Sequence, residues 1–200
     1  MDIKKERAMV AIKPDGIQRS LIGEIISRYE RAGLKLCAVK MVIPTPEFVE
    51  KHYLIDPEWP MKTGTKTIES YRKKGKVPPS EDPLEITKIV LGSLKKYLSS
   101  GPMIAMVWQG VNAVGVIRKI TGATEPLTSD VGTIRGDFTI DSYALSDIDG
   151  RSVRNLVHAS GTPEEAEKEI ELWFSPEEIK EYRLLNEAML YDVNLDGIME

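Results

Sequence analysis

The chain has 200 residues and a formal net charge of −4, with 42% hydrophobic and 29% charged residues. This length predicts one domain with a sizeable core, and the composition is ordinary for a soluble globular protein. The mild acidity excludes a whole-protein attraction to nucleic acid or to anionic membranes, although it still allows a local basic cleft.

Hydrophobic spacing divides the first part of the chain into strands and helices. Gly33 marks a helix end, because glycine tolerates the left-handed conformation common there. Thr45 and Pro46 indicate a helix start, as an N-cap residue and a proline in the first turn. The expected elements are a strand over residues 7–12, a turn over 13–16, a helix over 21–32, a strand over 34–43 and a short helix from residue 46.

The middle of the chain is less regular. Residues 55–83 are rich in proline, glycine and mixed charge, which predicts an exposed excursion from the core. Asn112 is a candidate cap for a helix that ends at Gly122. The other expected elements are a helix over residues 86–98, a strand over 102–108, a long connection over 123–137, a fourth strand at 138–140 and an added surface loop over 141–150.

Two capping boxes, Thr162–Glu165 and Ser175–Glu178, predict helix starts near the end of the chain. The resulting order of elements predicts an α+β fold with a four-stranded antiparallel sheet of the ferredoxin-like, split βαβ type. The helices are expected on one face of that sheet. A doubly wound fold is the alternative, but the second and third helices do not each link parallel strands.

Several familiar site motifs are absent. The sequence contains no GxxxxGK[ST] loop, no GxGxxG after a strand and no GxSxG. One cysteine and two histidines are too few for a structural zinc site. Cys37 lies in an apolar run and is interpreted as a buried small side chain, with a reactive thiol as the alternative. Residues 192–197 copy half of an EF-hand loop but lack its last glutamate, so no calcium site is expected.

Three cations adjoin predicted turns or loops and could together hold phosphate groups. Lys13 ends the first strand, Arg118 borders the apolar stripe of its helix, and Arg135 lies between loop glycines and the expected fourth strand. Arginine offers a planar fork to phosphate oxygens, and lysine offers a point charge. Thr124 and Asn155 are neutral hydrogen-bonding residues of the same loops. Taken singly, Lys13 could equally be a solvated surface residue, and each arginine could belong to an ion pair.

His158 follows an apolar pair, Leu156 and Val157. A lone histidine on an apolar stretch is usually a core residue, but the three small residues after this one leave space beside its ring. The free N–H groups of the helix that starts near Pro163 favour an anion in the same region. Glu169 flanks the inward stripe of that helix. Its carboxylate could hold one ring nitrogen and leave the other free as a nucleophile.

These segments also match a known family in order and spacing. They are ERAMVAIKPDGIQRSLIGEII, KKYLSSGPMIAMVWQG, GTIRGDF, and NLVHAS followed by AEKEIELWF. KPDG alone is unspecific, whereas GTIRGDF together with NxxH[GA]S is specific. On these motifs the chain closely resembles the nucleoside diphosphate kinase family. Residues 1–200 are expected to form a single such domain, with insertions at about 55–87 and 139–154.

The resemblance implies a role for each matched residue. His158 matches the histidine that carries phosphate, and Glu169 matches the carboxylate that orients it. Ser160 matches the serine just after that histidine, and Tyr53 matches the active-site tyrosine. The residues that match those holding the phosphates and sugar of the nucleotide are Lys13, Arg118, Thr124, Arg135 and Asn155.

The resemblance also implies a mechanism and partners. A nucleoside triphosphate would transfer its γ-phosphate to His158, and the phosphohistidine would pass it to a nucleoside diphosphate in a ping-pong reaction. Mg²⁺ would arrive with the nucleotide phosphates, so no metal ligand from the protein is expected. Base selectivity should be low, because the contacts are to phosphates and sugar. Family members usually assemble as hexamers and less often as tetramers, so a homo-oligomer is expected.

Three positions depart from the family pattern. Gly161 stands where an aspartate is usual, but Thr162 can still cap the next helix. Val90 aligns with a base-stacking phenylalanine, and an aliphatic surface stacks more weakly. Lys88 aligns with a phosphate-contacting arginine, so it keeps the charge and loses the planar fork.

Two other functions stay open on the sequence alone. The same scaffold could be a non-catalytic nucleotide-binding module, but the presence of His158 favours an enzyme. The basic run at residues 71–76 could contact nucleic acid, but it lies among acidic residues and is better explained as a solvated face. No apolar run approaches the ~18 residues of a membrane span, and the polar start is unlike a signal peptide. The expected partners are nucleotides, and the expected location is the cytoplasm.

Overall fold

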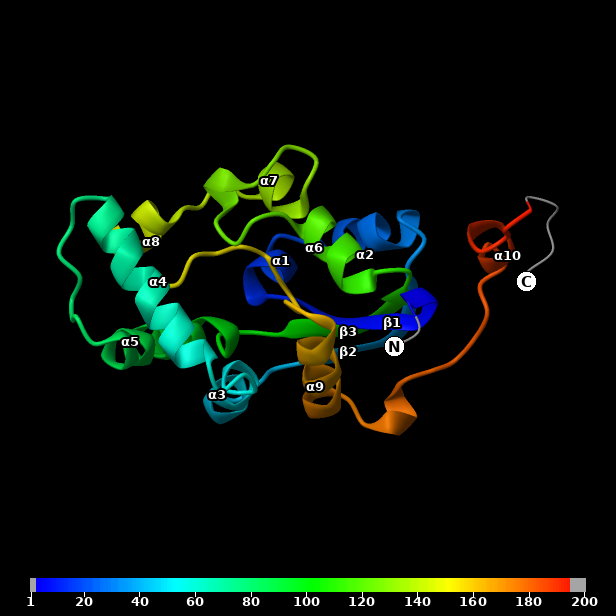
Figure 1. Cartoon of the computed structure of the whole chain (residues 1–200), viewed down its shortest axis with the longest axis horizontal. Helices are drawn as coiled ribbons and strands as arrows, with labels where there is room; N and C mark the ends of the chain where they lie inside the picture. Colours follow the sequence, from blue (N-terminus) through cyan, green and yellow to red (C-terminus); the bar gives the residue numbers. More distant parts are fainter. Residues whose placement is uncertain (1–2, 195–200) are drawn as a thin grey trace.

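The computed structural model describes residues 3–194 and contains one four-stranded sheet (Figure 1). Its strands are β1 (Glu6–Ile12), β2 (Lys35–Val42), β3 (Met103–Gly110) and β4 (Val157–Ala159). They lie in the order β2-β3-β1-β4, and every neighbouring pair is antiparallel. Of the half EF-hand loop, residues 195–197 lie outside the described residues.

Two helices begin at caps that the sequence predicted, Thr45 and Thr162, and a third begins at Asp82. The side chains of Thr45, Asp82 and Thr162 each accept a hydrogen bond from a backbone N–H of the first turn, and a proline follows each of them. The helices are α1 (Pro14–Gln18), α2 (Ile22–Arg31), α3 (Pro46–Tyr53), α4 (Trp59–Lys73), α5 (Pro83–Leu98), α6 (Ala113–Thr121), α7 (Ile134–Phe138), α8 (Tyr143–Ile148), α9 (Pro163–Trp173) and α10 (Glu187–Leu190), with 3₁₀ turns η1 (Ile3–Lys5), η2 (Pro126–Thr128) and η3 (Pro176–Glu178). None of the helices within residues 3–194 has the length and apolar character that crossing a bilayer requires.

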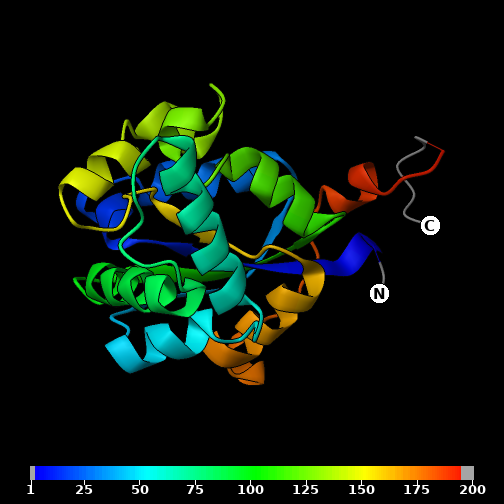
Figure 2. The same ribbon diagram turned by 60° about the vertical axis from the view of Figure 1, so that its left-hand side comes forward.

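Helices cover both faces of the sheet, so the prediction of a single covered face is wrong (Figures 1 and 2). Val10 and Ile12 of β1 pack with residues of α2 and α6 on one face. Met9 and Ala11 pack with residues of α3, α5 and α9 on the other. Successive side chains of a strand point to opposite faces. A strand such as β1, buried on both sides, therefore requires helices on both sides.

The fourth strand is Val157–Ala159, and the prediction of a strand at residues 138–140 is wrong. Phe138 ends helix α7 instead, and Thr133 caps that helix by accepting a hydrogen bond from a backbone N–H. In β4, His158 stands opposite Ala11 of β1. Three residues are too few to show a strand periodicity in the sequence. β4 is recognised as a strand only by its pairing with the longer strand β1.

Two predicted turns and caps also differ in the structure. The KPDG segment opens helix α1 instead of forming an isolated turn, with its proline in the first helical turn. Asn112 precedes α6 in a left-handed conformation with φ of 49°, and its side chain makes no capping bond. Glu6 of β1 accepts a hydrogen bond from the Val114 N–H at 2.9 Å. A carboxylate from the sheet therefore caps α6.

The two insertions contain helices where exposed irregular chain was predicted. Helix α4 occupies 15 residues of the first insertion and packs against α5. Helix α8 lies within the stretch 141–150. In α4, Pro60 stands in the first turn, where a missing N–H is tolerated, and Gly64 faces the backbone of Pro83. These two residues suggested irregular chain, but each has a helical position that suits it.

Gly64→Ala should separate α4 from α5. A β-carbon at this position would overlap the carbonyl group of Pro83, a backbone group that cannot rotate away. The free energy of unfolding should fall by about 1–3 kcal/mol, the usual effect of overpacking, as measured by urea denaturation.

Gly92→Ala in α5 is the matched control, because no atom beyond the surrounding backbone of its own helix lies within 4 Å of the added carbon. The better helix propensity of alanine should raise the free energy of unfolding by about 0.5–1 kcal/mol. Equal effects of the two substitutions would contradict the close contact at Gly64.

Candidate functional site

A cavity of about 750 Å³ opens beside the sheet, with walls from α4, α5, α6 and α8. Its size is in the range of small-molecule sites. Ser160 is buried and Lys88 is exposed on α5, and neither residue lines the cavity. The predicted site residues that line the cavity are Lys13, Tyr53, Val90, Arg118, Thr124, Arg135, Asn155, His158 and Glu169.

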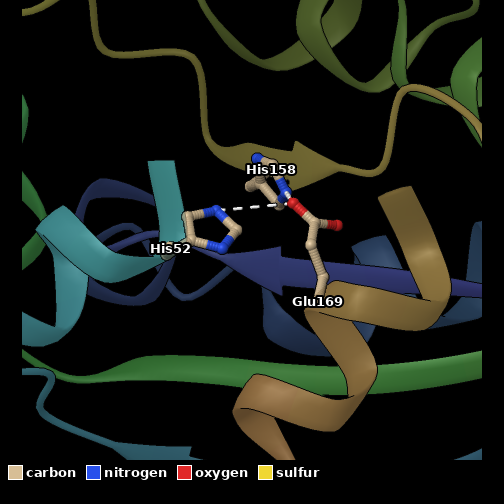
Figure 3. Close-up of side chains that lie close together, drawn as sticks. All are labelled: His52, His158 and Glu169. Atoms are coloured by element: carbon tan, nitrogen blue, oxygen red, sulfur yellow. Dashed lines mark hydrogen bonds and ion pairs between the residues drawn. The ribbon is translucent and has the colours of Figure 1, made fainter. Parts of the chain in front are cut away.

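His158 and Glu169 both line this cavity and point toward each other (Figure 3). His158 comes from β4 and Glu169 from α9, and His158 Nε2 lies 2.7 Å from Glu169 Oε1. An ionised carboxylate only accepts hydrogen bonds, so Nε2 carries the hydrogen. Nδ1, on the other side of the ring, therefore keeps its lone pair. The structure thus places these two residues as the sequence predicted.

Glu169 stays ionised although only 1% of it is exposed. Burial raises the pKa of this carboxyl, but the two nearby imidazoles and the hydrogen bonds from His158 and Ser160 outweigh burial and bring the pKa below its ordinary value. Ser160 Oγ donates to Oε2 at 2.6 Å and accepts from the Met9 N–H at 3.1 Å. Both carboxylate oxygens therefore have partners.

A tight turn precedes β4. Leu156 is buried with a φ of 66°, a left-handed conformation that is unfavourable for its side chain. The Val157 N–H donates to the Asn155 carbonyl at 2.7 Å, as in a γ-turn. The Leu156 carbonyl accepts from the Lys13 N–H at 2.8 Å, and the Leu156 N–H donates to Asp15 at 3.2 Å. These bonds hold the turn so that Asn155 lines the cavity while Leu156 enters the core.

Lys13 is buried at the end of β1, so the alternative of a solvated surface lysine is wrong. Only 5% of the residue is exposed, and its Nζ donates to Asn155 Oδ1 at 2.6 Å. Burial and the charge of Arg135 lower the pKa of Lys13 to about 7, although Asp15 opposes them. Near neutral pH the amine is therefore partly neutral, and an anion in the cavity would favour its protonation.

Arg135 donates to backbone carbonyls around the cavity. Its Nε bonds the Asn155 carbonyl at 3.0 Å, and its Nη2 bonds the Val157 carbonyl at 2.5 Å. Its Nη1 bonds the carbonyls of Gly122 and Ala123 at 3.0 and 2.9 Å. Four of its five N–H groups are thus used, and they connect the loop after α6 to the turn before β4. The ion pair considered as an alternative is not found among the described residues.

Arg118 and Thr124 also line the cavity, and both are exposed. The Thr124 carbonyl accepts from Asn155 Nδ2 at 2.8 Å, which fixes the orientation of that amide. Arg118 follows the buried Ile117 on α6, next to the apolar stripe, as its spacing predicted. The three predicted cations therefore converge on one cavity.

Aromatic and aliphatic side chains form another part of the lining. Tyr53, at the end of α3, lies against Trp59 of α4 with ring centroids 5.0 Å apart and planes 38° apart. Burial raises the pKa of Tyr53, so its hydroxyl keeps the proton. Val90 of α5 lines the same cavity. The first insertion thus supplies an aromatic ring, Trp59, that the alignment of Val90 had not suggested.

The two insertions meet beside the cavity, where α4 and α8 lie close together (Figures 1 and 2). Lys74 Nζ, just after α4, lies 3.5 Å from Asp147 Oδ2 of α8. The same ammonium group is 5.7 Å from the ring centre of Tyr143. All three residues line the cavity. Both insertions therefore contribute side chains to the cavity lining.

Helix α9 is capped although Gly161 replaces the usual aspartate. Thr162 Oγ1 accepts from the Glu165 N–H at 3.1 Å, and Glu165 Oε2 accepts from the Gly161 N–H at 2.7 Å. The expectation that Thr162 preserves the cap is therefore confirmed.

His52 is a site residue that the sequence interpretation missed. It is buried on α3, and its ring centroid lies 4.5 Å from that of His158. Its Nε2 is 3.6 Å from Glu169 Oε1, and its Nδ1 accepts from Trp173 Nε1 at 3.1 Å. The available signal was helical spacing, since Val49 and His52 are three residues apart and share the buried face of α3.

His52, His158 and Glu169 also approach closely enough to hold a metal ion, with ligand atoms within 4.8 Å of one another. Their hydrogen bonds oppose this use. His158 Nε2 carries its hydrogen for the carboxylate, and the donor Trp173 places the hydrogen of His52 on Nε2 as well. A metal would have to displace both hydrogens.

The other carboxylates that line the cavity are engaged with the protein. Asp56 accepts from a backbone N–H at 2.9 Å, Asp147 pairs with Lys74, and Glu165 is bound to the Gly161 N–H. Mg²⁺ prefers oxygen ligands and often binds largely through phosphates and water. The cavity therefore suits an ion that arrives on a polyphosphate better than one held by the protein.

The family model described as nucleoside diphosphate kinase matches residues 6–66 and 85–179. The chain belongs to the nucleoside diphosphate kinase family. The unmatched segment between these ranges lies within the first insertion and comprises the end of α4, the connection to α5 and the first two residues of α5.

Relatives of the nucleoside diphosphate kinase family match nearly the whole chain. The enzyme of Pyrobaculum aerophilum is 46% identical over 180 residues, which cover 88% of this chain and 98% of the relative. The crystal structure of an NDP kinase from that organism has a TM-score of 0.85 and 44% identity, and covers 88% of this chain and 100% of the other. A transition-state mimic of the Borrelia burgdorferi enzyme with bound vanadate and ADP has a TM-score of 0.77 and 34% identity. The match covers 94% of this chain and 98% of the other.

As a nucleoside diphosphate kinase, the chain is a phosphotransferase that acts between nucleoside triphosphates and diphosphates. The predicted α+β, ferredoxin-like fold is confirmed by its four-stranded antiparallel sheet and by the structures of its relatives.

The buried Lys13 predicts proton uptake when a nucleotide binds. Its pKa of about 7 makes the amine neutral above that pH, and a phosphate oxygen beside it would raise the pKa again. The affinity for ADP should therefore fall as the pH rises above 7. Calorimetry at about pH 8 in buffers with different ionisation heats should detect uptake of up to about one proton.

Lys13→Arg is the control, because a guanidinium stays charged over this whole range. Binding of ADP to that variant should show much less proton uptake. An uptake equal to that of the unaltered chain would contradict the assignment to Lys13.

Proposed function

We propose that the chain transfers phosphate by a ping-pong mechanism through a phosphohistidine on His158. Nδ1 attacks the γ-phosphorus of a nucleoside triphosphate. The new N–P bond forms as the bond from phosphorus to the β–γ bridging oxygen breaks, and the diphosphate leaves. A terminal oxygen of a second diphosphate then attacks phosphorus, and the N–P bond breaks. The observation that carries this proposal is the 2.7 Å contact of Nε2 with Glu169, which leaves Nδ1 free.

Glu169 would match the charge that develops on the ring. When Nδ1 bonds to phosphorus while Nε2 keeps its hydrogen, the imidazole becomes cationic. A buried carboxylate already aligned with Nε2 stabilises that charge without rearrangement. Ser160 supports the same step by holding the second carboxylate oxygen.

The cations of the cavity would hold the phosphates. Lys13 supplies an ammonium group, Arg118 an exposed guanidinium, and Arg135 its remaining N–H. Asn155 and Thr124 would contact the sugar or phosphates from the same loops. Catalysis would then rest largely on positioning and charge neutralisation.

Mg²⁺ would be carried by the nucleotide, where it neutralises charge on the phosphate oxygens. The engaged state of the cavity carboxylates supports this assignment, and no protein ligand is assigned to the ion.

The base would contact an apolar surface that does not read hydrogen-bonding groups. Tyr53, Trp59 and Val90 provide such a lining, which supports low base selectivity. Lys88 lies outside the cavity lining, so we assign it no phosphate contact.

We propose that the chain assembles as a homo-oligomer, a hexamer by analogy with its family. Val39, Met41 and Ile43, on or just after the edge strand β2, are each more than half exposed, which supports a subunit contact there. The single cysteine, Cys37, is buried and free, which suits a reducing compartment, and we propose the cytoplasm.

Labelling with γ-labelled ATP tests the phosphohistidine. The chain should acquire acid-labile, base-stable phosphate in the presence of Mg²⁺ and lose it when a nucleoside diphosphate is added. His158→Ala removes the attacking nitrogen and should abolish the label. Lys88→Ala, a change at an exposed position outside the cavity, should label normally. Label that survives in His158→Ala would overturn the assignment.

We further propose that residues 1–200 form one domain of this family whose insertions, at about 55–87 and 139–154, retain the bound nucleotide. The two insertions contact each other through Lys74 and Asp147, which both line the cavity, and this contact supports the role. Both side chains are partly exposed, so the contact is weak and can open and close.

Lys74→Glu tests this role by placing like charges together. A repulsion of about 1 kcal/mol should raise the dissociation rate of ADP about fivefold, as measured by stopped-flow fluorescence. Combining it with Asp147→Lys restores opposite charges and should restore slow release. If the single and double variants released ADP as fast as the unaltered chain, the insertions would have no part in retention.

A further inference from the structure

His52 is buried among the groups that hold Glu169 and takes no part in the mechanism described so far (Figure 3). It lies in the last turn of α3, with 5% of its surface exposed. Its ring packs edge to face against His158, with planes 81° apart. Trp173 of α9 packs against it as well, with ring centroids 5.6 Å apart. The site thus contains a second imidazole, held between the nucleophile and an indole.

Trp173 determines which ring nitrogen of His52 carries hydrogen. An indole N–H can only donate, and Trp173 Nε1 donates to His52 Nδ1 at 3.1 Å. Nδ1 is therefore an acceptor. In a neutral imidazole the hydrogen must then lie on Nε2.

His52 is neutral throughout the physiological range. Its burial, and the repulsion from a protonated His158 or Lys13, lower its pKa to about 3, although Glu169 opposes them. The indole adds a geometric reason, because protonation of His52 would place a hydrogen on the nitrogen that faces the Trp173 N–H. Two donors would then point at each other.

The Nε2–H of His52 faces the carboxylate that orients the nucleophile. Nε2 lies 3.6 Å from Glu169 Oε1, the same oxygen that accepts from His158 at 2.7 Å. The longer distance exceeds a hydrogen bond, so this contact is an attraction between a charge and an N–H dipole. In a dry site such an attraction is stronger than in water.

We propose that His52 is a positioning residue, which presents a fixed Nε2–H to Glu169 and so keeps that carboxylate aligned and fully charged for His158. The role rests on the proposed phosphohistidine mechanism. A neutral donor supports the carboxylate without cancelling its charge. A cationic His52 would compete with His158 for the Glu169 carboxylate. The hydrogen bond from Trp173 to Nδ1 prevents the protonation of His52.

The small number of histidines allows a direct test of the tautomer. The chain has only two, His52 and His158, so nitrogen-15 labelling of histidine yields four ring nitrogen signals in NMR spectra. Without nucleotide at neutral pH, His52 should show an unprotonated Nδ1 and a protonated Nε2. Trp173→Phe keeps an aromatic ring but removes the donor, so it should populate the other tautomer of His52 and shift the Nε2 signal of His158.

Kinetics test the consequence for catalysis. Trp173→Phe should slow phosphorylation of His158 by ATP in a single turnover by up to about 100-fold, the loss that a catalytic group misplaced by about 1 Å can cause. The dissociation constant of ADP should stay unchanged. His52→Leu should slow the step at least as much. His52→Gln, which keeps an N–H donor near Glu169, should recover part of the rate.

Trp108→Phe is the matched control for loss of an indole. Trp108 Nε1 is buried and has no hydrogen-bond partner among residues 3–194, and its side chain packs on the opposite face of the sheet. This variant should leave both the histidine signals and the phosphorylation rate unchanged.

Three results would overturn the proposal. The first is a protonated Nδ1 on His52 in the unaltered chain. The second is a normal phosphorylation rate in both Trp173→Phe and His52→Leu. The third is a slower rate that Trp108→Phe reproduces, since that would reflect packing alone. Failure of the unaltered chain to form phosphohistidine would instead refute the proposed function, and the NMR signals would still report the tautomer.

Discussion

The buried carboxylate of Glu169 is the constraint on which the site depends. An ionised group with 1% exposure is unfavourable unless its oxygens have partners. Here His158 and Ser160 donate to it, and His52 faces it. His158 belongs to β4, Ser160 directly follows β4, and His52 belongs to α3, whereas Glu169 itself belongs to α9. The site therefore forms only when both the sheet and the helices on its second face have packed, and the nucleophile is oriented by the same packing that stabilises the fold.

Features that depend on local chemistry could be predicted from the sequence. The helix starts at Thr45 and Thr162 follow from a hydroxyl that binds first-turn N–H groups, and a following proline fits the helix there. The pairing of His158 with Glu169 could be predicted for a similar reason. The apolar stripe of α9 fixes which of its glutamates points inward, and small residues beside the histidine leave room for it.

Features that depend on contacts distant in sequence could not be predicted in this way. Strand β4 has three residues and is defined by its pairing with β1. Helix α4 contains a glycine that appears unfavourable until the backbone of α5 is placed against it. The cap of α6 is Glu6, more than 100 residues away in the chain. His52 becomes a site residue only through Trp173 and Glu169, which α9 brings to it.

The C-terminal segment changes the character of the sheet edge. Cys37 is the extra residue of a bulge in β2, and its carbonyl accepts from the Lys180 N–H at 2.8 Å. Tyr182 Oη donates to the neighbouring Leu36 carbonyl at 2.9 Å. Unpaired carbonyl groups at a sheet edge can accept hydrogen bonds from a strand of another molecule. The segment after α9 thus shields the first half of β2 against uncontrolled sheet growth, and a chain shortened before Lys180 would lose that protection.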